Sequence, residues 1–413
     1  MKPRRLLFVD GHPATPGGAQ VNLIELLGHP QARTQWEIRV ACDPASPLSG
    51  TLTRQRILRQ HYRHPEPVGR LGRLFRLGTA RHREQAARRL QDLLAGFQPE
   101  AVISCSGRDH LAAGMAAAAA GIPSVWWVNE NLTPDFFSWA ARRTFVSEAL
   151  AHATRLVPVS HYGATALKQA GVPENRIRVV HNGIPLRRHQ RGHSTLLRRQ
   201  LRLKPGEPLI GFVGRITPWK GPRFFLELAE RWAAERRPGR FVLLGPVARE
   251  DEAFAASLRE FVRDRGLRGR VSFPPPPPSE ADALAQIDLL IHCSIKPEPF
   301  GRVIIEGMAA GVPVIGACDG GVPEIITQGV NGGMAAPGNL TDYLARLTAV
   351  LGNPAMRAAW VNAGHRTVQQ RFTLDRVFDD FEGVFEELAQ AARPKSARRS
   401  PASNDPPAAV AAG

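Results

Sequence analysis

Two glutamates stand eight positions apart in the segment Glu298-Pro299-Phe300-Gly301-Arg302-Val303-Ile304-Ile305-Glu306. Pro299 suits the first position of a helix, so the backbone amides of Phe300 and Gly301 would be free to bind a phosphate at the positive end of the helix dipole. A carboxylate at the mouth of that helix can accept hydrogen bonds from sugar hydroxyls, and one two turns further along can bind both hydroxyls of a ribose. The alternative is an acid that only favours the helix dipole, together with an unrelated surface acid.

A second segment, Gly214-Arg215-Ile216-Thr217-Pro218-Trp219-Lys220-Gly221, follows a predicted buried strand and begins a predicted helix. It places two cations, Arg215 and Lys220, at the carboxyl end of a strand, where they can neutralise a diphosphate. The sequence has no Asp-x-Asp to hold a divalent ion, so these cations would carry that role without a metal. The segment also lacks the GxxxxGK[ST] spacing of a Walker loop. The alternative is a pair of solvated loop cations.

Two glycine-rich loops could bring the backbone close to a ligand. Gly17 and Gly18 follow the first predicted strand and begin the first predicted helix, and glycine permits such a close approach. The spacing is not GxGxxG, and no ribose-binding acid follows the second strand, so an NAD site has little support. The other loop is Gly320-Gly321-Val322-Pro323-Glu324. Ordinary turn chemistry is the alternative for each loop.

Short apolar runs alternate with helical stretches along the whole chain. Repeated strand–helix units predict an α/β fold with parallel sheets and crossover helices. The predicted strands are 6–9, 38–41, 101–103, 125–128, 156–159, 177–180, 210–213, 241–244, 271–273, 289–292 and 314–316. The predicted helices are 17–28, 79–97, 108–120, 135–152, 162–170, 220–236, 251–265, 279–287, 301–310, 339–370 and 373–391. Ligands of such sheets bind beyond the carboxyl ends of the strands.

A basic, polar stretch divides these units into two series of similar size. The pattern predicts two Rossmann-like domains that face each other across a cleft, which is then the expected ligand site. The predicted division is 1–185 for the N-terminal domain, 186–206 for the linker, 207–372 for the C-terminal domain, 373–391 for a last helix and 392–413 for a disordered tail.

Composition places the chain among ordinary folded proteins. Of its 413 residues, 43% are hydrophobic and 22% charged, which excludes a wholly disordered chain. The four cysteines lie far apart, so neither a disulfide framework nor a zinc site is expected, and a reducing cytoplasm suits them. No signal peptide or membrane-spanning segment is recognisable. The net charge of +17 indicates attraction to an anion: nucleic acid, phospholipid or a phosphorylated substrate.

Together, the motifs resemble those of family 4 glycosyltransferases. Gly-Gly near the first helix, Gly-Arg-x4-Lys-Gly, Glu-x7-Glu and Gly-Gly-x-Pro-Glu occur in that family's order. Val159-Ser160 and Val180-His181-Asn182-Gly183-Ile184 are also similar, and the resemblance spans roughly 1–391. It implies the GT-B fold and a retaining hexosyltransferase-type reaction. A sugar would pass from a nucleoside diphosphate sugar to a hydroxyl acceptor, with neither metal nor cofactor.

The resemblance also implies roles for individual residues. Arg215 and Lys220 would hold the donor diphosphate, and Glu298 would bind the donor sugar beside the reaction centre, so these three are the expected catalytic residues. Glu306 would bind the ribose. The other expected donor-binding residues are Gly17, Gly18, Phe300, Gly301 and Glu324.

The acceptor side departs from the family's pattern at one position. Many members carry a histidine at the end of the fifth strand, where Asn129 stands here. Asparagine can orient a hydroxyl but cannot act as a base, although in a front-face mechanism the leaving phosphate can take the acceptor proton. Asn129 and His12 are the expected acceptor contacts. Because the family is used most often for bacterial envelope glycans, the resemblance implies a glycan or lipid-linked acceptor in lipopolysaccharide, capsule or exopolysaccharide synthesis.

Residues 54–89 contain eleven arginines, and Leu71, Leu74, Phe75 and Leu77 add apolar contacts at near-helical spacing. Such a segment can lie on an anionic bilayer, and the alternative is a solvated, arginine-rich helix face. The expected location is the cytoplasm, with peripheral attachment to the inner face of the plasma membrane.

Two other functions stay open. One is a GT-B-like sugar-nucleotide epimerase, and the other is a nucleic-acid-binding protein, for which no recognised motif is present.

Overall fold

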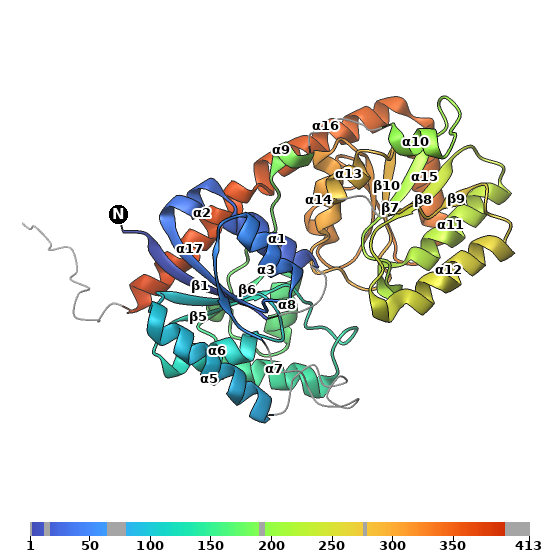
Figure 1. The fold of residues 1–413 in the computed structure, drawn as a ribbon. Coiled ribbons are helices and arrows are strands. Elements are labelled where there is room, and N and C mark those ends of the chain that lie inside the picture. The colour runs from blue at the N-terminus through green and yellow to red at the C-terminus, as the bar shows by residue number, and fades with distance from the viewer. Residues whose placement is uncertain (1, 12–16, 64–79, 190–194, 276–278, 393–413) are drawn as a thin grey trace, which may run out of the picture.

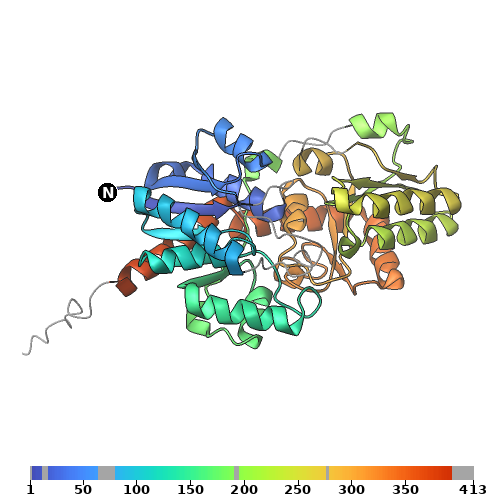
Figure 2. The same ribbon diagram turned by 60° about the horizontal axis from the view of Figure 1, so that its bottom comes forward.

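The computed structural model describes residues 2–11, 17–63, 80–189, 195–275 and 279–392. Within them the chain forms two parallel sheets of six strands, ordered β3-β2-β1-β4-β5-β6 and β12-β11-β10-β7-β8-β9. Helices cover both sheets, and the two units lie side by side (Figures 1 and 2). The predicted class, two Rossmann-like domains with parallel sheets, is confirmed.

The first unit is built around β1, which pairs in parallel with both β2 and β4. Its strands are β1 (Arg4–Asp10), β2 (Trp36–Cys42), β3 (Leu58–His61), β4 (Ala101–Ser104), β5 (Ser124–Val128) and β6 (Arg155–Pro158). Its helices are α1 (Gly18–Leu27), α2 (Pro30–Gln35), α3 (Pro47–Arg54), α5 (Ala80–Phe97), α6 (His110–Ala119), α7 (Trp139–His152) and α8 (His161–Gln169). The strand order reverses at β1 and β4, so the loops after these strands and after β5 line the edge where ligands bind in such folds.

The second unit is built around β7, which pairs with β8 and β10. Its strands are β7 (Leu209–Val213), β8 (Arg240–Leu244), β9 (Val271–Ser272), β10 (Leu289–His292), β11 (Val314–Ala317) and β12 (Gly333–Ala335). Its helices are α11 (Pro222–Ala234), α12 (Glu252–Asp264), α13 (Glu280–Leu284), α14 (Arg302–Ala309), α15 (Leu340–Gly352) and α16 (Pro354–Arg371). Here the order reverses between β7 and β10, and the segments after these two strands carry the motifs around Lys220 and Glu298.

Two connections join the units. Short helices α9 (Leu186–His189) and α10 (Leu196–Gln200) lie on the passage from the first to the second. The chain returns through α17 (Leu374–Ala392), which runs back over the first unit from the end of α16 (Figure 1). Phe378 of α17 stacks on Trp36 with ring centroids 4.9 Å apart, and Phe381 meets Trp127 edge-on at 4.9 Å. This aromatic contact fixes the returning helix to the first sheet.

The sequence interpretation differs from the structure at a few elements. Short β3 and β12 were not predicted, whereas 177–180 was predicted as a strand and forms only an isolated bridge between Ile177 and Leu156. The predicted helix 339–370 is two helices, because Asn353 is extended and caps α16 with its side chain. Beyond Ala392, the predicted tail lies outside the described residues, and so do residues 276–278. None of the described helices is long and apolar enough to cross a membrane.

Candidate active site

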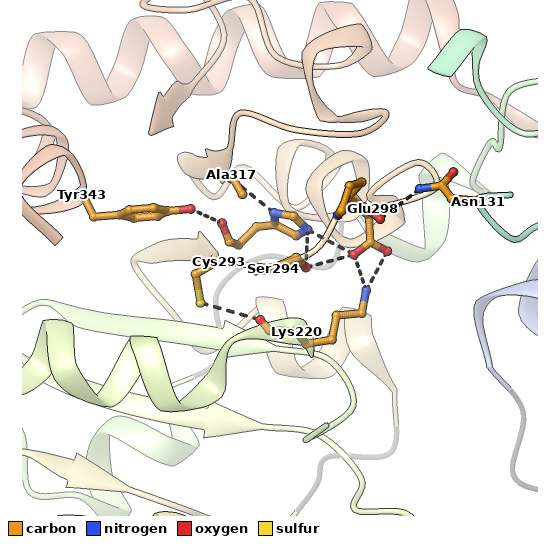
Figure 3. Close-up of polar contacts among 9 residues, drawn as sticks. Asn131, Lys220, Cys293, Ser294, Glu298, Ala317 and Tyr343 are labelled. Atoms are coloured by element: carbon orange, nitrogen blue, oxygen red, sulfur yellow. Dashed lines mark hydrogen bonds and ion pairs between the residues drawn. The ribbon is translucent and has the colours of Figure 1, made fainter. Parts of the chain in front are cut away.

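The segments after β7 and β10 bring a lysine and a glutamate together at the edge of the second sheet that faces the first unit (Figure 3). Lys220 ends the short 3-10 turn η2 (Pro218–Lys220), and its Nζ lies 2.6 Å from both Oε1 and Oε2 of Glu298. Glu298 is only 8% exposed. The sequence placed these two residues at one site, and the structure brings them into a direct ion pair.

Neighbouring groups hold the Glu298 carboxylate ionised. Ser294 Oγ donates to Oε2 at 3.0 Å, and His292 Nε2 lies 3.5 Å from the same oxygen. The Ala317 amide donates to His292 Nδ1 at 3.4 Å, which leaves the ring proton on Nε2, facing Glu298. Burial raises the pKa of Glu298, but the Lys220 charge and the His292 hydrogen bond outweigh it and hold the pKa well below its usual value. Sequence reasoning missed His292 and Ser294, although a histidine ending a predicted buried strand was the available signal.

Glycines let the surrounding loops close on this pair. Gly221 has φ +77°, and a Cβ there would collide with the carbonyl oxygen of Cys293. Gly320 has φ +63°, and a Cβ there would collide with the backbone of Glu298. The Gly321 amide also donates to the Glu298 carbonyl at 2.9 Å. The Gly320-Gly321 loop therefore packs directly against the backbone of Glu298. Residues with a Cβ could not approach that backbone as closely.

The start of α14 presents the backbone amides that the sequence indicated. Gly301, with φ +100°, is the N-cap residue of α14, and Phe300 before it is buried. Free amides and the helix dipole make such an end favourable for an anion. Arg215, after β7, has an exposed side chain.

A cavity of about 400 Å³ opens beyond the carboxyl ends of β7, β8 and β9. It is lined by Ile216, Leu243, Gly245, Val247, Ala255, Arg259, Phe273, Pro274 and Pro275.

Glu306, one turn inside α14, is held by an arginine that also reaches the other unit. Arg302 Nε donates to Glu306 Oε1 at 2.7 Å, and Nη2 donates to Oε2 of Glu25 in α1 at 2.6 Å. Arg302 also contacts Asn22. Burial raises the pKa of Glu306 to about 7, although the Arg302 charge opposes it. Sequence reasoning considered only the backbone amide of Arg302 and did not single out the side chains of Arg302, Glu25 or Asn22; the local signal for the Arg302 side chain was its i, i+4 spacing to Glu306.

On the first unit, α1 begins at two glycines. Gly17 is the N-cap residue, and its amide donates to Gln20 Oε1 at 2.9 Å. Among the residues that the structure describes, no atom lies within 4 Å of where a Cβ of Gly18 would be. These described residues leave Gly18 accessible to a ligand. His12, the other expected contact from this loop, lies outside the described residues.

The loop after β5 faces the same region. Asn129 Nδ2 donates to the Trp127 carbonyl at 3.2 Å, and its Oδ1 accepts from Asn22 at 3.4 Å. Asn22 also contacts Arg302, so the side chain of Asn22 links Asn129 to Arg302. Two residues further, Asn131 Nδ2 donates across to the Pro297 carbonyl at 2.9 Å, beside Glu298 (Figure 3). The structure thus places the loop after β5 against the segment before Glu298, through Asn131, and against Asn22, through Asn129.

Glu324 ends the turn η4 (Val322–Glu324) and points toward the first unit rather than toward Glu298. Its oxygens accept from the amides of His161 at 2.9 Å and Tyr162 at 2.7 Å, at the start of α8. His181 Nε2 lies 2.9 Å from Glu324 Oε2. Glu324 therefore bridges the two units, while the glycines before it contact the Glu298 backbone.

The fold and the facing segments define a two-domain glycosyltransferase of the GT-B type. Residues 194–367 match the family described as "Glycosyl transferases group 1", and residues 16–188 match "Glycosyltransferase Family 4". The chain belongs to the family 4 glycosyltransferases, as the motifs predicted.

Similar curated proteins include two bacterial D-inositol 3-phosphate glycosyltransferases. The one from Nocardia farcinica is 33% identical over 214 residues, which is 50% of this chain and 47% of the relative. The one from Rhodococcus erythropolis is 32% identical over 259 residues, which is 61% of this chain and 57% of the relative. The chain thus spans about half the length of these relatives.

Two solved structures share the fold. Anabaena HepE, solved in complex with UDP and glucose, has a TM-score of 0.79 at 23% identity, covering 92% of this chain and 99% of HepE. Sucrose-phosphate synthase from Thermosynechococcus elongatus has a TM-score of 0.76 at 19% identity, covering 94% of this chain and 100% of the synthase. At these identities the likeness shows the GT-B fold.

Proposed function

We propose that this protein transfers a sugar from a nucleoside diphosphate sugar to a hydroxyl group of an acceptor, with retention at the anomeric carbon and without a metal in the reaction. The Lys220–Glu298 pair at the start of α14 carries the proposal. A buried carboxylate held ionised is an acceptor for sugar hydroxyls, and the adjacent ammonium is a partner for the donor diphosphate. Both groups are present in one place, with free helix amides beside them.

The rest of the donor has supporting residues. The cavity beyond β7, β8 and β9 has room for a nucleobase against Phe273, and Glu306 would bind the ribose once Arg302 gives way. HepE, a structural neighbour, has been solved with UDP and with UDP-glucose, which supports a nucleotide-sugar donor.

In the proposed reaction, the bond between the anomeric carbon and the diphosphate breaks and negative charge builds on the leaving oxygen. Arg215, Lys220 and the amides of Phe300 and Gly301 would stabilise that charge, with no divalent ion needed. The acceptor hydroxyl attacks from the side of the departing phosphate, which takes its proton, so the configuration is retained. Asn129 and His12 would orient the acceptor, and neither has to act as a base.

The acceptor is proposed to be a glycan or a lipid-linked glycan of the bacterial envelope, which sets the protein at the cytoplasmic face of the plasma membrane. Support for the membrane contact is the basic segment 54–89, whose apolar positions Leu71, Leu74, Phe75 and Leu77 lie outside the described residues. The net charge of +17 is attractive to an anionic bilayer and to phosphorylated acceptors alike.

The test is a screen of nucleotide sugars by thermal shift, followed by turnover with the sugars that bind, because a ligand of the folded state raises the melting temperature. Transfer predicts release of free nucleoside diphosphate only when an acceptor is present, and a product whose anomeric configuration matches the donor. Conversion of the donor sugar without any acceptor would instead indicate an epimerase. An inverted product would contradict the retaining mechanism.

A further inference from the structure

A cluster of two histidines and one glutamate lies where the two units meet, and neither the family assignment nor the proposed reaction uses it as a metal site. His161 is the first residue of α8, His181 lies on the segment leading to α9, and Glu324 ends η4 of the second unit. One ligand atom from each of the three lies within 4.8 Å of the other two. The imidazole rings of His161 and His181 are 5.2 Å apart between centroids, at 68° to one another.

We propose that these three side chains bind one divalent transition-metal ion, with zinc as the best fit, at the junction of the two domains. Imidazole nitrogens and a carboxylate oxygen form a common ligand set for zinc, and solvent can fill the fourth position. Ligand atoms of a tetrahedral zinc site lie ~3.3 Å apart, since each is ~2.05 Å from the metal. His181 Nε2 and Glu324 Oε2, at 2.9 Å, are already that close. The exposed His161 ring has only to turn toward them.

The surroundings favour the charged form of the carboxylate. The amides of His161 and Tyr162, at the start of α8, donate to the two oxygens of Glu324 at 2.9 and 2.7 Å, and hydrogen bonds to a carboxylate favour its ionised form. The two amides also fix the carboxylate in place, as hydrogen bonds commonly do for metal-binding carboxylates. The side chains of His181 and Glu324 are 23% and 17% exposed, so a metal ion can enter from solvent.

The ligand set exists only when the domains are together, because two ligands belong to the first unit and one to the second. Glu324 follows directly on the loop whose Gly321 amide binds the Glu298 carbonyl. A bound metal would therefore stabilise the closed arrangement of the domains and the loop that seats Glu298. This site lies outside the reaction, which is proposed to need no metal.

The experiment is a titration of the metal-free, full-length chain with ZnCl2 at pH 7.5, followed by isothermal calorimetry, with no substrate present. Cys318 is exposed and its thiol can bind zinc, so every sample carries Cys318→Ser. We expect one site per chain. His161→Ala and His181→Ala should each weaken binding at least ~10-fold, since each removes a ligand. The matched control is His61→Ala, which removes an exposed histidine of β3 and should leave binding unchanged.

A spectroscopic arm identifies the ligands. Cobalt(II) in place of zinc should give visible d–d absorption that is absent in His181→Ala. The His161→Ala variant keeps the hydrogen bond from its backbone amide to Glu324. It therefore tests whether the three side chains bind metal even if His181→Ala folds poorly. Absence of stoichiometric binding, or equal binding by His161→Ala and the parent, would overturn the proposal. Neither result bears on sugar transfer, which is assayed separately.

Discussion

At the scale of single residues, the two cations that are proposed to bind the donor diphosphate are the first to test. Lys220→Ala and Arg215→Ala should each lower transfer by about 100-fold or more, because the leaving diphosphate gains charge in the transition state and no metal shares it. Steady-state rates with a saturating acceptor would measure this. Chelation with EDTA should leave unchanged the rate of the His161→Ala variant, which lacks one ligand of the proposed zinc site. An activity abolished by EDTA and restored by manganese would contradict the metal-independent mechanism.

Substitutions at Glu298 and Glu306 should impair different properties of the enzyme. Glu298 would lie beside the reacting sugar, so Glu298→Gln should reduce kcat more than nucleotide affinity. Glu306 would bind the ribose, which changes little during the reaction, so Glu306→Ala should mainly weaken nucleoside diphosphate binding. Turnover and calorimetric affinity, measured on the same preparations, separate the two effects. Equal losses of affinity in both variants would refute this division.

Glu306 also predicts a pH dependence. Burial raises its pKa to about 7, above the usual value of a glutamate, so the carboxyl takes up its proton as pH falls through 7. A protonated carboxyl accepts ribose hydroxyls less well than a carboxylate. Nucleoside diphosphate affinity should therefore fall several-fold from pH 8 to pH 6. The phosphate of the ligand titrates in the same range, so the comparison is with Glu306→Gln, which should keep only the ligand's own dependence. Parallel curves for both proteins would exclude Glu306 as the titrating group.

At the scale of elements, the sequence predicted most of what positions the site, because the signals there are local. A proline at the start of a helix, a glycine at the end of a strand and an apolar run are each readable within a few residues. The sequence therefore indicated α14, the turn after β7, and strands β7 and β10. The strand order of the second sheet reverses between these two strands. Edge strands β3 and β12 were missed, because Leu58 of β3 is exposed and β12 is only three residues long, so neither shows a buried apolar pattern.

What could not be predicted lies between elements that are far apart in the chain. The Arg302 contacts to Glu25 and Asn22 join residues separated by about 280 positions, and the Glu324 contacts to α8 join residues separated by about 160. No local spacing encodes such pairs. Their geometry depends on how the two domains dock, which the sequence patterns of either domain do not contain.

The returning helix α17 makes a prediction about stability. Phe381 is fully buried against Trp127, so Phe381→Ala should lower the free energy of unfolding of the first domain by about 3–5 kcal/mol, through lost burial and a cavity. Urea unfolding followed by tryptophan fluorescence would measure it. Asp379→Ala, an exposed change on the same helix, should stay within about 0.5 kcal/mol of the parent. A loss for Phe381→Ala no larger than that of Asp379→Ala would mean that α17 is not packed as described.

At the scale of the whole molecule, the basic segment predicts membrane attachment. The protein should sediment with anionic vesicles and not with zwitterionic ones, and added salt should weaken the binding through screening. Changing Arg70, Arg73 and Arg76 to Gln together should reduce vesicle binding while leaving donor affinity intact. If the parent protein stays in the supernatant with anionic vesicles at low salt, segment 54–89 does not bind membranes and is only a solvated, arginine-rich surface.

Arg302 joins the two domains and also pairs with a residue that is proposed to bind the donor. It binds Glu306 on its own helix and Glu25 on the other domain. If the donor ribose binds Glu306 as proposed, the Arg302–Glu306 ion pair has to loosen, and the Arg302 contact with the other domain should change with it. We therefore expect donor binding and the domain contact to be coupled through Arg302.

Glu25→Gln tests this coupling, because it removes the charge on the first domain and leaves the donor residues untouched. The Arg302 guanidinium loses an ion pair at 2.6 Å that is almost fully buried, so the closed arrangement should be less populated. We expect a larger radius of gyration by small-angle X-ray scattering without ligand. Glu37→Gln, which changes an exposed glutamate of β2, is the matched control and should scatter like the parent. An unchanged radius for Glu25→Gln would mean that the Arg302–Glu25 ion pair is not needed to hold the domains, because the contacts of Arg302 with Asn22, of Asn131, of Glu324 and of α17 suffice.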